Sequence, residues 1–218
     1  MKRAATRRGA PSDATAAATL YRICSVLLRY PDRAVLDLLD DVDRVLPTVG
    51  PDTAATVGRF LAWLRAAPPD DAAAHYVDTF DHSRRRSLYL TYYRYGDTRN
   101  RGMALLTLKH VYRQAGYPPP EAELPDFLPL MLEFAALAPE PGARALAQCR
   151  AGMELLRGAL HDAGSPYRHL IDALCARLPA LGTREHAELR RLAVDGPPVE
   201  QVGLEPFAPP EFAEGRHP

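Results

Sequence analysis

The chain has 218 residues, of which 47% are hydrophobic and 25% are charged, a composition that is typical of globular proteins and excludes a globally disordered chain. Its 27 Lys and Arg residues balance its 27 Asp and Glu residues, so no overall charge favours nucleic acid or a membrane as a partner.

The sequence predicts neither a secretion signal nor a membrane span. Pro11, Ser12 and Asp13 interrupt the stretch after the basic N-terminus, so no apolar signal region follows it. Nowhere do 18 apolar residues follow one another. Three cysteines (Cys24, Cys149, Cys175) form no CxxC pair and suit small buried positions in a reducing compartment. We therefore expect a cytoplasmic protein.

The first part of the chain reads as three helices. Apolar residues spaced by three and four predict helices over 14–29, 32–46 and 52–66. Asp32 is expected to cap the second of them. Trp63 lies one position off the apolar stripe of the third, so it packs on a neighbouring helix or contacts a partner.

The central part is less regular. A helix is predicted over 70–80 and another over 100–115, which Asn100 or Asp97 is expected to cap. The stretch 88–95 reads LYLTYYRY, whose aromatic and β-branched residues permit a strand. Because no partner strand is predicted, we interpret it as a short helix.

The segment 127–138 is apolar nearly all round, which is typical of a helix at the centre of a bundle, and Asp126 is a candidate N-cap. Further helices are predicted over 142–162, 166–178 and 184–193.

About eight to ten helices and no strand pair predict an all-α fold, a single helical bundle. We expect it to occupy residues 14–194. Residues 1–13 are predicted to be a flexible arm. Residues 195–218 are rich in Pro and Glu and are predicted to be a disordered tail.

No catalytic constellation is recognisable. The sequence has no phosphate-binding loop and no nucleophile elbow. Its seven histidines include no HExxH pair. His161 and Asp162 form an HD dipeptide, as in helical metal phosphohydrolases, but this short pattern arises easily by chance. We expect no catalytic residue and no metal, with a phosphohydrolase as the enzyme alternative.

Charge is distributed unevenly along the central part. Residues 81–101 contain six arginines and two aspartates, whereas residues 114–143 contain five acids and no Lys or Arg. One interpretation is a solvated basic turn followed by an ordinary acidic loop. The other is a polar groove whose acids receive a cationic peptide and whose tyrosines line it. Asp126 then belongs to the groove instead of serving only as a cap.

Three segments carry a family resemblance. They are LYRICSVLLRYPD at 20–32, the stretch from Tyr76 to Leu105, and ELPDFLPLMLEF at 123–134. In this order they resemble the NarJ-type chaperones of respiratory nitrate reductase, within the TorD/DmsD group of redox-enzyme maturation proteins. The chain departs from the family pattern at Tyr95 and Phe127, where His is frequent, and at Thr98, where Ser is common.

The resemblance implies a TorD-like all-helical fold without enzymatic activity. It implies binding to the N-terminal region of the apo catalytic (alpha) subunit of nitrate reductase in the cytoplasm. It also implies help with insertion of molybdopterin guanine dinucleotide, without permanent binding of that cofactor, and with assembly of the membrane complex. A monomer or weak dimer is expected. The alternative client is another molybdoenzyme, recognised by its twin-arginine leader.

The candidate site residues fall into three groups. The acids expected to contact the peptide are Asp126, Glu133 and Glu123. The apolar and aromatic contacts are Leu88, Tyr89, Tyr92, Phe127 and Leu130. Arg84, Arg99 and Arg101 match family positions and either pair with Asp81 or Asp97 to hold the central loop or touch the client.

Overall fold

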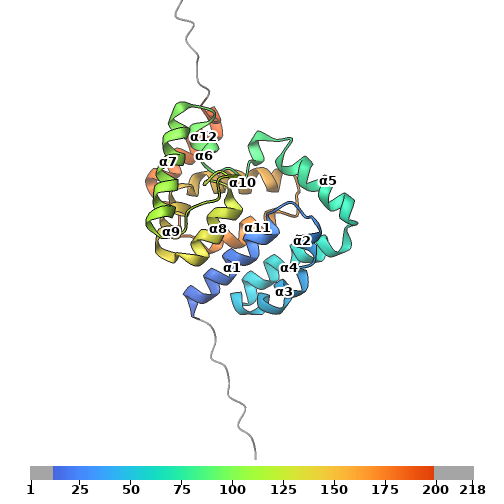
Figure 1. The fold of residues 1–218 in the computed structure, drawn as a ribbon. Coiled ribbons are helices and arrows are strands. Elements are labelled where there is room, and N and C mark those ends of the chain that lie inside the picture. The colour runs from blue at the N-terminus through green and yellow to red at the C-terminus, as the bar shows by residue number, and fades with distance from the viewer. Residues whose placement is uncertain (1–11, 199–218) are drawn as a thin grey trace, which may run out of the picture.

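The computed structural model describes residues 12–198, and these residues fold into helices joined by loops (Figure 1). In chain order the elements are α1 (Asp13–Leu27), α2 (Arg33–Leu36), α3 (Leu39–Val45), the 3₁₀ helix η1 (Leu46–Val49), α4 (Pro51–Ala66), α5 (Pro69–Phe80), the 3₁₀ helix η2 (Arg84–Arg86), α6 (Thr91–Tyr95), α7 (Arg99–Gln114), α8 (Leu128–Leu137), α9 (Pro139–Gln148), α10 (Arg150–Asp162), α11 (Arg168–Arg177) and α12 (Thr183–Asp195). The predicted all-α class is confirmed.

Helices α1, α8 and α11 lie in the middle of the molecule, with α3 to α5 on one side and α6, α7, α9 and α12 on the other (Figure 1). α8 packs against both α1 and α9. Its Leu128, Met131 and Leu132 have no exposed surface, as expected for a helix that is apolar nearly all round. The predicted central position of this helix is therefore confirmed.

Two predicted helices are each divided. The helix predicted over 32–46 consists of α2 and α3, because the Leu38 N–H bonds to the Val35 carbonyl three residues back and tightens the turn. The helix predicted over 142–162 consists of α9 and α10, and the same type of bond from Cys149 to Leu146 marks the break. α9 also begins earlier than predicted, at Pro139, since prolines are tolerated in a first helical turn.

The interpretation of 88–95 as a helix is correct only for α6. Tyr89 instead forms an isolated antiparallel β-bridge with Phe127. Leu90 N–H donates to the Asp126 carbonyl at 3.0 Å, and Leu128 N–H donates to the Leu88 carbonyl at 2.8 Å. The strand alternative thus holds only for Tyr89. A single bridging residue leaves no alternating pattern in the sequence, so the sequence could not reveal its partner.

Of the predicted N-caps, one is confirmed and two are wrong. The Asp32 side chain accepts a hydrogen bond from the Val35 N–H at 3.0 Å. Thr98, not Asn100 or Asp97, stands at the N-cap of α7 and makes no capping bond. Phe127 stands at the N-cap of α8, so Asp126 does not cap that helix.

The core is built mainly from apolar and aromatic side chains. Tyr167 is fully buried, and its ring lies 4.8 Å from both Phe60 and Phe80. Trp63 packs on this cluster, and its ring centroid is 5.1 Å from that of His75 in α5. Of the two roles predicted for Trp63, the structure shows packing on a neighbouring helix. All three cysteines are buried and free, as predicted.

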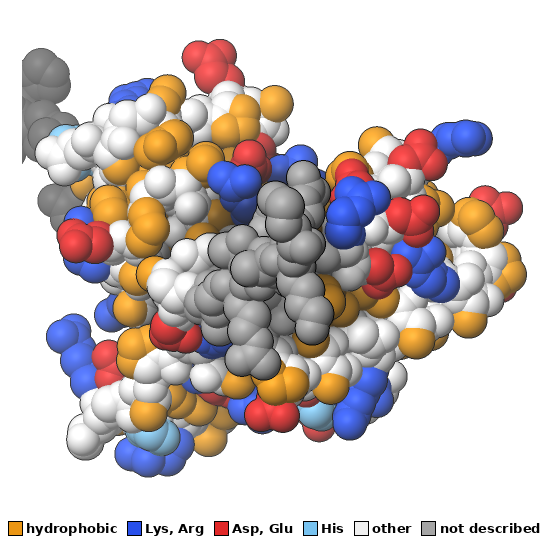
Figure 2. Space-filling model, turned by 90° about the horizontal axis from the view of Figure 1, so that it is seen from below, with side chains coloured by type: hydrophobic (Ala, Val, Ile, Leu, Met, Phe, Trp, Pro, Cys, Tyr) orange, Lys and Arg blue, Asp and Glu red, His pale blue; other side chains and the backbone are white. Residues whose placement is uncertain are grey.

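The visible side chains on the face seen from below mix hydrophobic, acidic and basic types, in keeping with the balanced net charge (Figure 2). In residues 12–198 no helix combines the length and apolar character that a membrane crossing requires. Residues 1–11 of the predicted arm and 199–218 of the predicted tail lie outside the described residues.

Candidate functional site

Tyr89, Glu123 and Phe127 meet at the β-bridge and form a small surface that we call the bridge surface. Tyr89 and Phe127 are opposite each other in a pair that shares no backbone hydrogen bond of its own, the arrangement that brings side chains closest. Their ring centroids are 5.3 Å apart, with an interplanar angle of 34°. All three side chains are partly exposed. Parts of two aromatic rings and of a carboxylate are therefore open to solvent side by side.

A hydrogen bond organises the polar side of the bridge surface. The Tyr89 hydroxyl donates to Glu123 Oε1 at 3.1 Å, and the same oxygen accepts the Leu124 N–H at 2.8 Å. Burial and the nearby Glu123 carboxylate raise the pKa of Tyr89 to about 12. The phenol therefore keeps its proton near neutral pH and holds the carboxylate in one orientation.

Asp126 lies beneath the bridge surface and has no exposed area. Its Oδ2 atom accepts hydrogen bonds from the Thr91 N–H at 3.2 Å and from the Thr91 hydroxyl at 2.5 Å. Arg101 Nη2 is 3.5 Å from the same oxygen, and Arg101 Nε donates to Thr91 Oγ1 at 3.3 Å. Asp126 therefore binds the first residue of α6, not the start of the helix that follows it. Thr91, Arg101 and Asp126 are the buried polar cluster.

In this structure the Asp126 carboxylate is not accessible to a partner. Instead, the buried polar cluster links three segments: the loop before α8, the start of α6 and the first turn of α7. Arg101 also approaches Asp97 at 3.6 Å and lies 5.8 Å from the ring centroid of Tyr92. Since the bridge backbone runs through the Asp126 carbonyl, the cluster holds the bridge surface in place.

The other predicted contacts are placed elsewhere. Leu88 is buried next to the bridge. Leu130 packs partly buried against Tyr112 and Phe134. Glu133 pairs with Arg29 at 3.1 Å, and both side chains are about half exposed. The structure thus groups Tyr89, Glu123 and Phe127 but does not bring Leu130 or Glu133 to the same point.

Arg29 and Glu133 flank a groove of about 650 Å³ between α1, α2 and α8, which we call the Arg29 groove. Its rim carries Tyr30, Leu38 and Leu137, which are 48%, 41% and 40% exposed. The sequence predicted α8, which contributes Glu133 and Leu137 to this groove. It did not predict the groove, because the groove walls come from segments about a hundred residues apart in the chain.

The predicted arginines have different environments. Arg84 is 4.0 Å from Asp97, so the ion-pair alternative with Asp97 describes both Arg84 and Arg101. Asp81 is exposed, and so is Arg99 at the start of α7.

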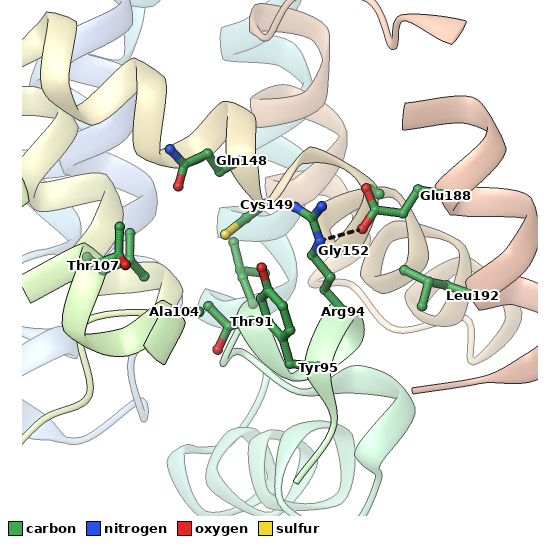
Figure 3. A pocket seen from close by; sticks show the side chains of 13 residues that line it. Thr91, Arg94, Tyr95, Ala104, Thr107, Gln148, Cys149, Gly152, Glu188 and Leu192 are labelled. Carbon is green, nitrogen blue, oxygen red and sulfur yellow. Dashed lines mark ion pairs between the residues drawn. The ribbon is translucent and has the colours of Figure 1, made fainter. Parts of the chain in front are cut away.

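Sequence reasoning also missed a pocket of about 260 Å³ between α6, α7, α10 and α12 (Figure 3). Arg94 and Glu188 point toward each other across it and form an ion pair at 3.0 Å. The thiol of Cys149 and the backbone at Gly152 form part of its wall. No local pattern links Arg94 to Glu188, which explains why the sequence did not reveal this pocket.

The HD dipeptide does not form a metal centre within the described residues. His161 Nε2 lies 2.9 Å from Asp172 Oδ1, so it pairs with α11 and not with its neighbour Asp162. Burial opposes ionisation of Asp172, but hydrogen bonds from His161 and Arg157 outweigh it and lower the pKa of this carboxyl. Across residues 12–198, no three His, Cys, Asp or Glu side chains gather in a way that could hold a metal ion.

Comparison with known sequences gives a consistent picture. Residues 47–172 match the sequence model of the family described as nitrate reductase delta subunit. The chain is 37% identical over 170 residues to the probable nitrate reductase molybdenum cofactor assembly chaperone NarJ of Bacillus subtilis, a match covering 77% of this chain and 92% of that protein. It is 35% identical over 156 residues to the nitrate reductase molybdenum cofactor assembly chaperone NarJ of Escherichia coli K12. This match covers 70% of this chain and 66% of that protein.

A longer protein is also similar. The chain is 43% identical over 157 residues to the nitrate reductase-like protein NarX of Mycobacterium tuberculosis, a match covering 72% of this chain. The matched part spans only 24% of that protein's length.

Proposed function

Because this chain belongs to the nitrate reductase delta subunit family, we propose that it is an assembly chaperone for a nitrate reductase and not an enzyme. It acts in the cytoplasm on the apo catalytic subunit, which it holds by the N-terminal region. It keeps that subunit competent to receive its molybdenum cofactor, which is cargo for the client and not a resident group of this chain. Assembly of the membrane complex follows.

The observation that carries this proposal is the bridge surface, together with the family. Tyr89 and Phe127 offer apolar area with a rigid geometry, and Glu123 offers a fixed negative charge beside them. An amphipathic peptide helix with a basic residue near its apolar face suits such a surface. The apolar side chains provide affinity, and the charge provides orientation.

The Arg29 groove is a natural continuation of the binding surface. The buried Tyr76 lies beside this groove, since its ring centroid is 5.5 Å from that of Tyr30. Burial raises the pKa of Tyr76, and the charges of both Glu123 and Arg29 act on it. We propose that the client peptide runs from the bridge surface into the Arg29 groove, where Glu133 provides the second acidic contact.

Calorimetric titration with a peptide of the first few dozen residues of the cognate catalytic subunit tests the proposal. We expect micromolar or tighter binding, about −8 kcal/mol or stronger. Glu123→Gln is expected to weaken binding roughly tenfold, by about 1.4 kcal/mol, because a charge-assisted contact is lost. The matched control is Glu140→Gln, at an exposed acid of α9, which should bind like the parent protein.

Two results would change the conclusion. If the peptide does not bind but a twin-arginine leader from another molybdoenzyme does, the chaperone class stands and the client is different. If Glu123→Gln and Glu140→Gln both bind the peptide like the parent protein, the bridge surface is not the site.

A further inference from the structure

Helix α7 presents an exposed face with apolar and basic side chains. Met103 and Leu106 are 64% and 60% exposed, although both are large and apolar. His110 and Arg113 continue the same face, since the four positions are separated by three or four residues. Leu108 and Tyr112, the buried residues of α7, lie on the opposite side. We call Met103, Leu106, Lys109, His110 and Arg113 the α7 face.

The charges of this helix have one sign. α7 reads RNRGMALLTLKHVYRQ and contains no acid. Arg101 is turned inward onto Asp126, but Lys109 and Arg113 form no ion pair within residues 12–198. The exposed Arg113 and the partly exposed Lys109 thus lie beside an apolar stripe that no described element covers. A segment that is both acidic and apolar is complementary to such a face.

The C-terminal segment of the same chain has this composition. Residues 199–218 read VEQVGLEPFAPPEFAEGRHP and include four glutamates against one arginine. Leu204, Phe207 and Phe212 are spaced between the glutamates. The apolar residues match Met103 and Leu106, and the glutamates match Lys109 and Arg113.

The described chain ends beside the start of α7. A Cβ atom placed on Gly96 would lie 1.8 Å from the carbonyl oxygen of Pro198, so these two residues are in direct contact. Gly96 comes shortly before Arg99, the first residue of α7. At about 1.5 Å per residue, Leu106 lies about 11 Å along the helix from Arg99. Extended chain covers about 3.3 Å per residue, so Leu204 and Phe207 reach this point with ease.

We propose that residues 199–218 bind the α7 face of their own chain. Leu204 and the two phenylalanines cover Met103 and Leu106, and the glutamates pair with Lys109 and Arg113. A short covalent connection gives an effective concentration of about millimolar, so contacts that are individually weak suffice. The α7 face is distinct from the bridge surface, and its contact with residues 199–218 does not depend on the client.

Paramagnetic broadening in the full-length protein provides the test. The three native cysteines are buried, so a nitroxide reagent attaches selectively to an Ala208→Cys variant. We expect the amide signals of Met103, Leu106 and His110 to lose most of their intensity, and to recover when the nitroxide is reduced. Added salt should restore part of the intensity, because it screens exposed charge pairs.

A second variant adds Met103→Gln and Leu106→Gln to the labelled chain. Both positions are exposed, so the fold is expected to persist, and the broadening along α7 should disappear. The matched control adds Val194→Gln, another exposed apolar position, and should keep the broadening. Unchanged α7 signals in the labelled chain would overturn the proposal. So would equal broadening in a mixture of spin-labelled and isotope-labelled copies, because the occupant would then be another molecule.

Discussion

Asp126 is completely buried, and its Oδ2 atom bonds to the backbone and side chain of Thr91. Its other oxygen, Oδ1, has no hydrogen-bond partner among the described residues. The carboxylate faces the guanidinium of Arg101, whose side chain is only 17% exposed. At this residue the charge is used for positioning, and the partly exposed Glu123 nearby is the acid that we propose contacts the client.

Replacing Asp126 tests this division of roles. Asp126→Asn leaves Arg101 without its buried counter-charge, so the free energy of unfolding is expected to fall by about 3 kcal/mol. Urea denaturation measures this value. Asp97→Asn removes the exposed partner of the same arginine and should cost less than about 1 kcal/mol. Equal losses in the two variants would contradict a special role for the buried carboxylate.

The same residue marks where sequence reasoning stops. Asp126 precedes a helix, so the local pattern predicted an N-cap there. The structure instead pairs it with Thr91, which lies 35 residues earlier in the chain. Asp32 was predicted correctly because its acceptor and donor are three residues apart. Local pairs can be read from spacing, whereas a contact made by tertiary packing leaves no periodic signal.

At the scale of the elements, close packing between helices depends on two glycines. In α9, a Cβ atom on Gly142 would lie 2.2 Å from the Cα atom of Ala135 in α8. In α10, a Cβ atom on Gly152 would lie 3.1 Å from the Leu90 carbonyl oxygen, next to the bridge. The first contact sets how closely α9 approaches the central helix, and the second sets how closely α10 approaches α6.

A pair of glycine substitutions separates packing from helix propensity. Gly142→Ala must push α8 and α9 apart, so the free energy of unfolding is expected to fall by about 2 kcal/mol or more. Gly158→Ala lies in α10 with nothing within 4 Å, so it should stabilise the protein by about 0.5–1 kcal/mol. Denaturant midpoints of the two variants should therefore move in opposite directions. A stabilising Gly142→Ala would contradict the close approach of the two helices.

Helical periodicity predicted most elements but not their breaks. The buried stripe of Leu146, Cys149 and Met153 is continuous in the sequence, so the pattern indicated one helix over 142–162. The chain nevertheless tightens at Cys149, and the stripe stays buried on both sides of the break. A periodic pattern reports which residues face the core but is insensitive to a short turn that preserves that face.

At the scale of the whole molecule, long-range contacts join the N-terminal and C-terminal halves of the described chain. Arg177 at the end of α11 pairs with Asp13 at the start of α1 and donates to the Val49 carbonyl at 2.8 Å. His75 of α5 similarly contacts Ser165, before α11, at 3.0 Å. Burial lowers the pKa of His75 below its usual value of 6.5. The stability of the molecule is therefore coupled to protonation at this junction.

The sign of this coupling predicts the pH dependence of folding. Because the unfolded chain takes up the His75 proton more readily than the folded protein, stability falls as pH decreases below about 6.5. Thermal unfolding between pH 7.5 and about 5 measures the effect. His75→Gln should show a shallower decrease than the parent protein. His186→Gln, at an exposed histidine of α12, should keep the parental slope, and a parental slope in His75→Gln would contradict the prediction.

The three buried thiols make the folded protein a reporter of its own fluctuations. Burial raises the pKa of Cys24 beyond the usual thiol range, that of Cys149 to about 12 and that of Cys175 to about 11. A thiol that is buried and protonated reacts with alkylating reagents only when its surroundings open. Cys24 lies in α1, Cys149 at the junction of α9 and α10, and Cys175 in α11. The alkylation rates of Cys24 and Cys175 therefore report the opening of two regions of the native bundle, whereas the rate of Cys149 reports access through the pocket that its thiol lines.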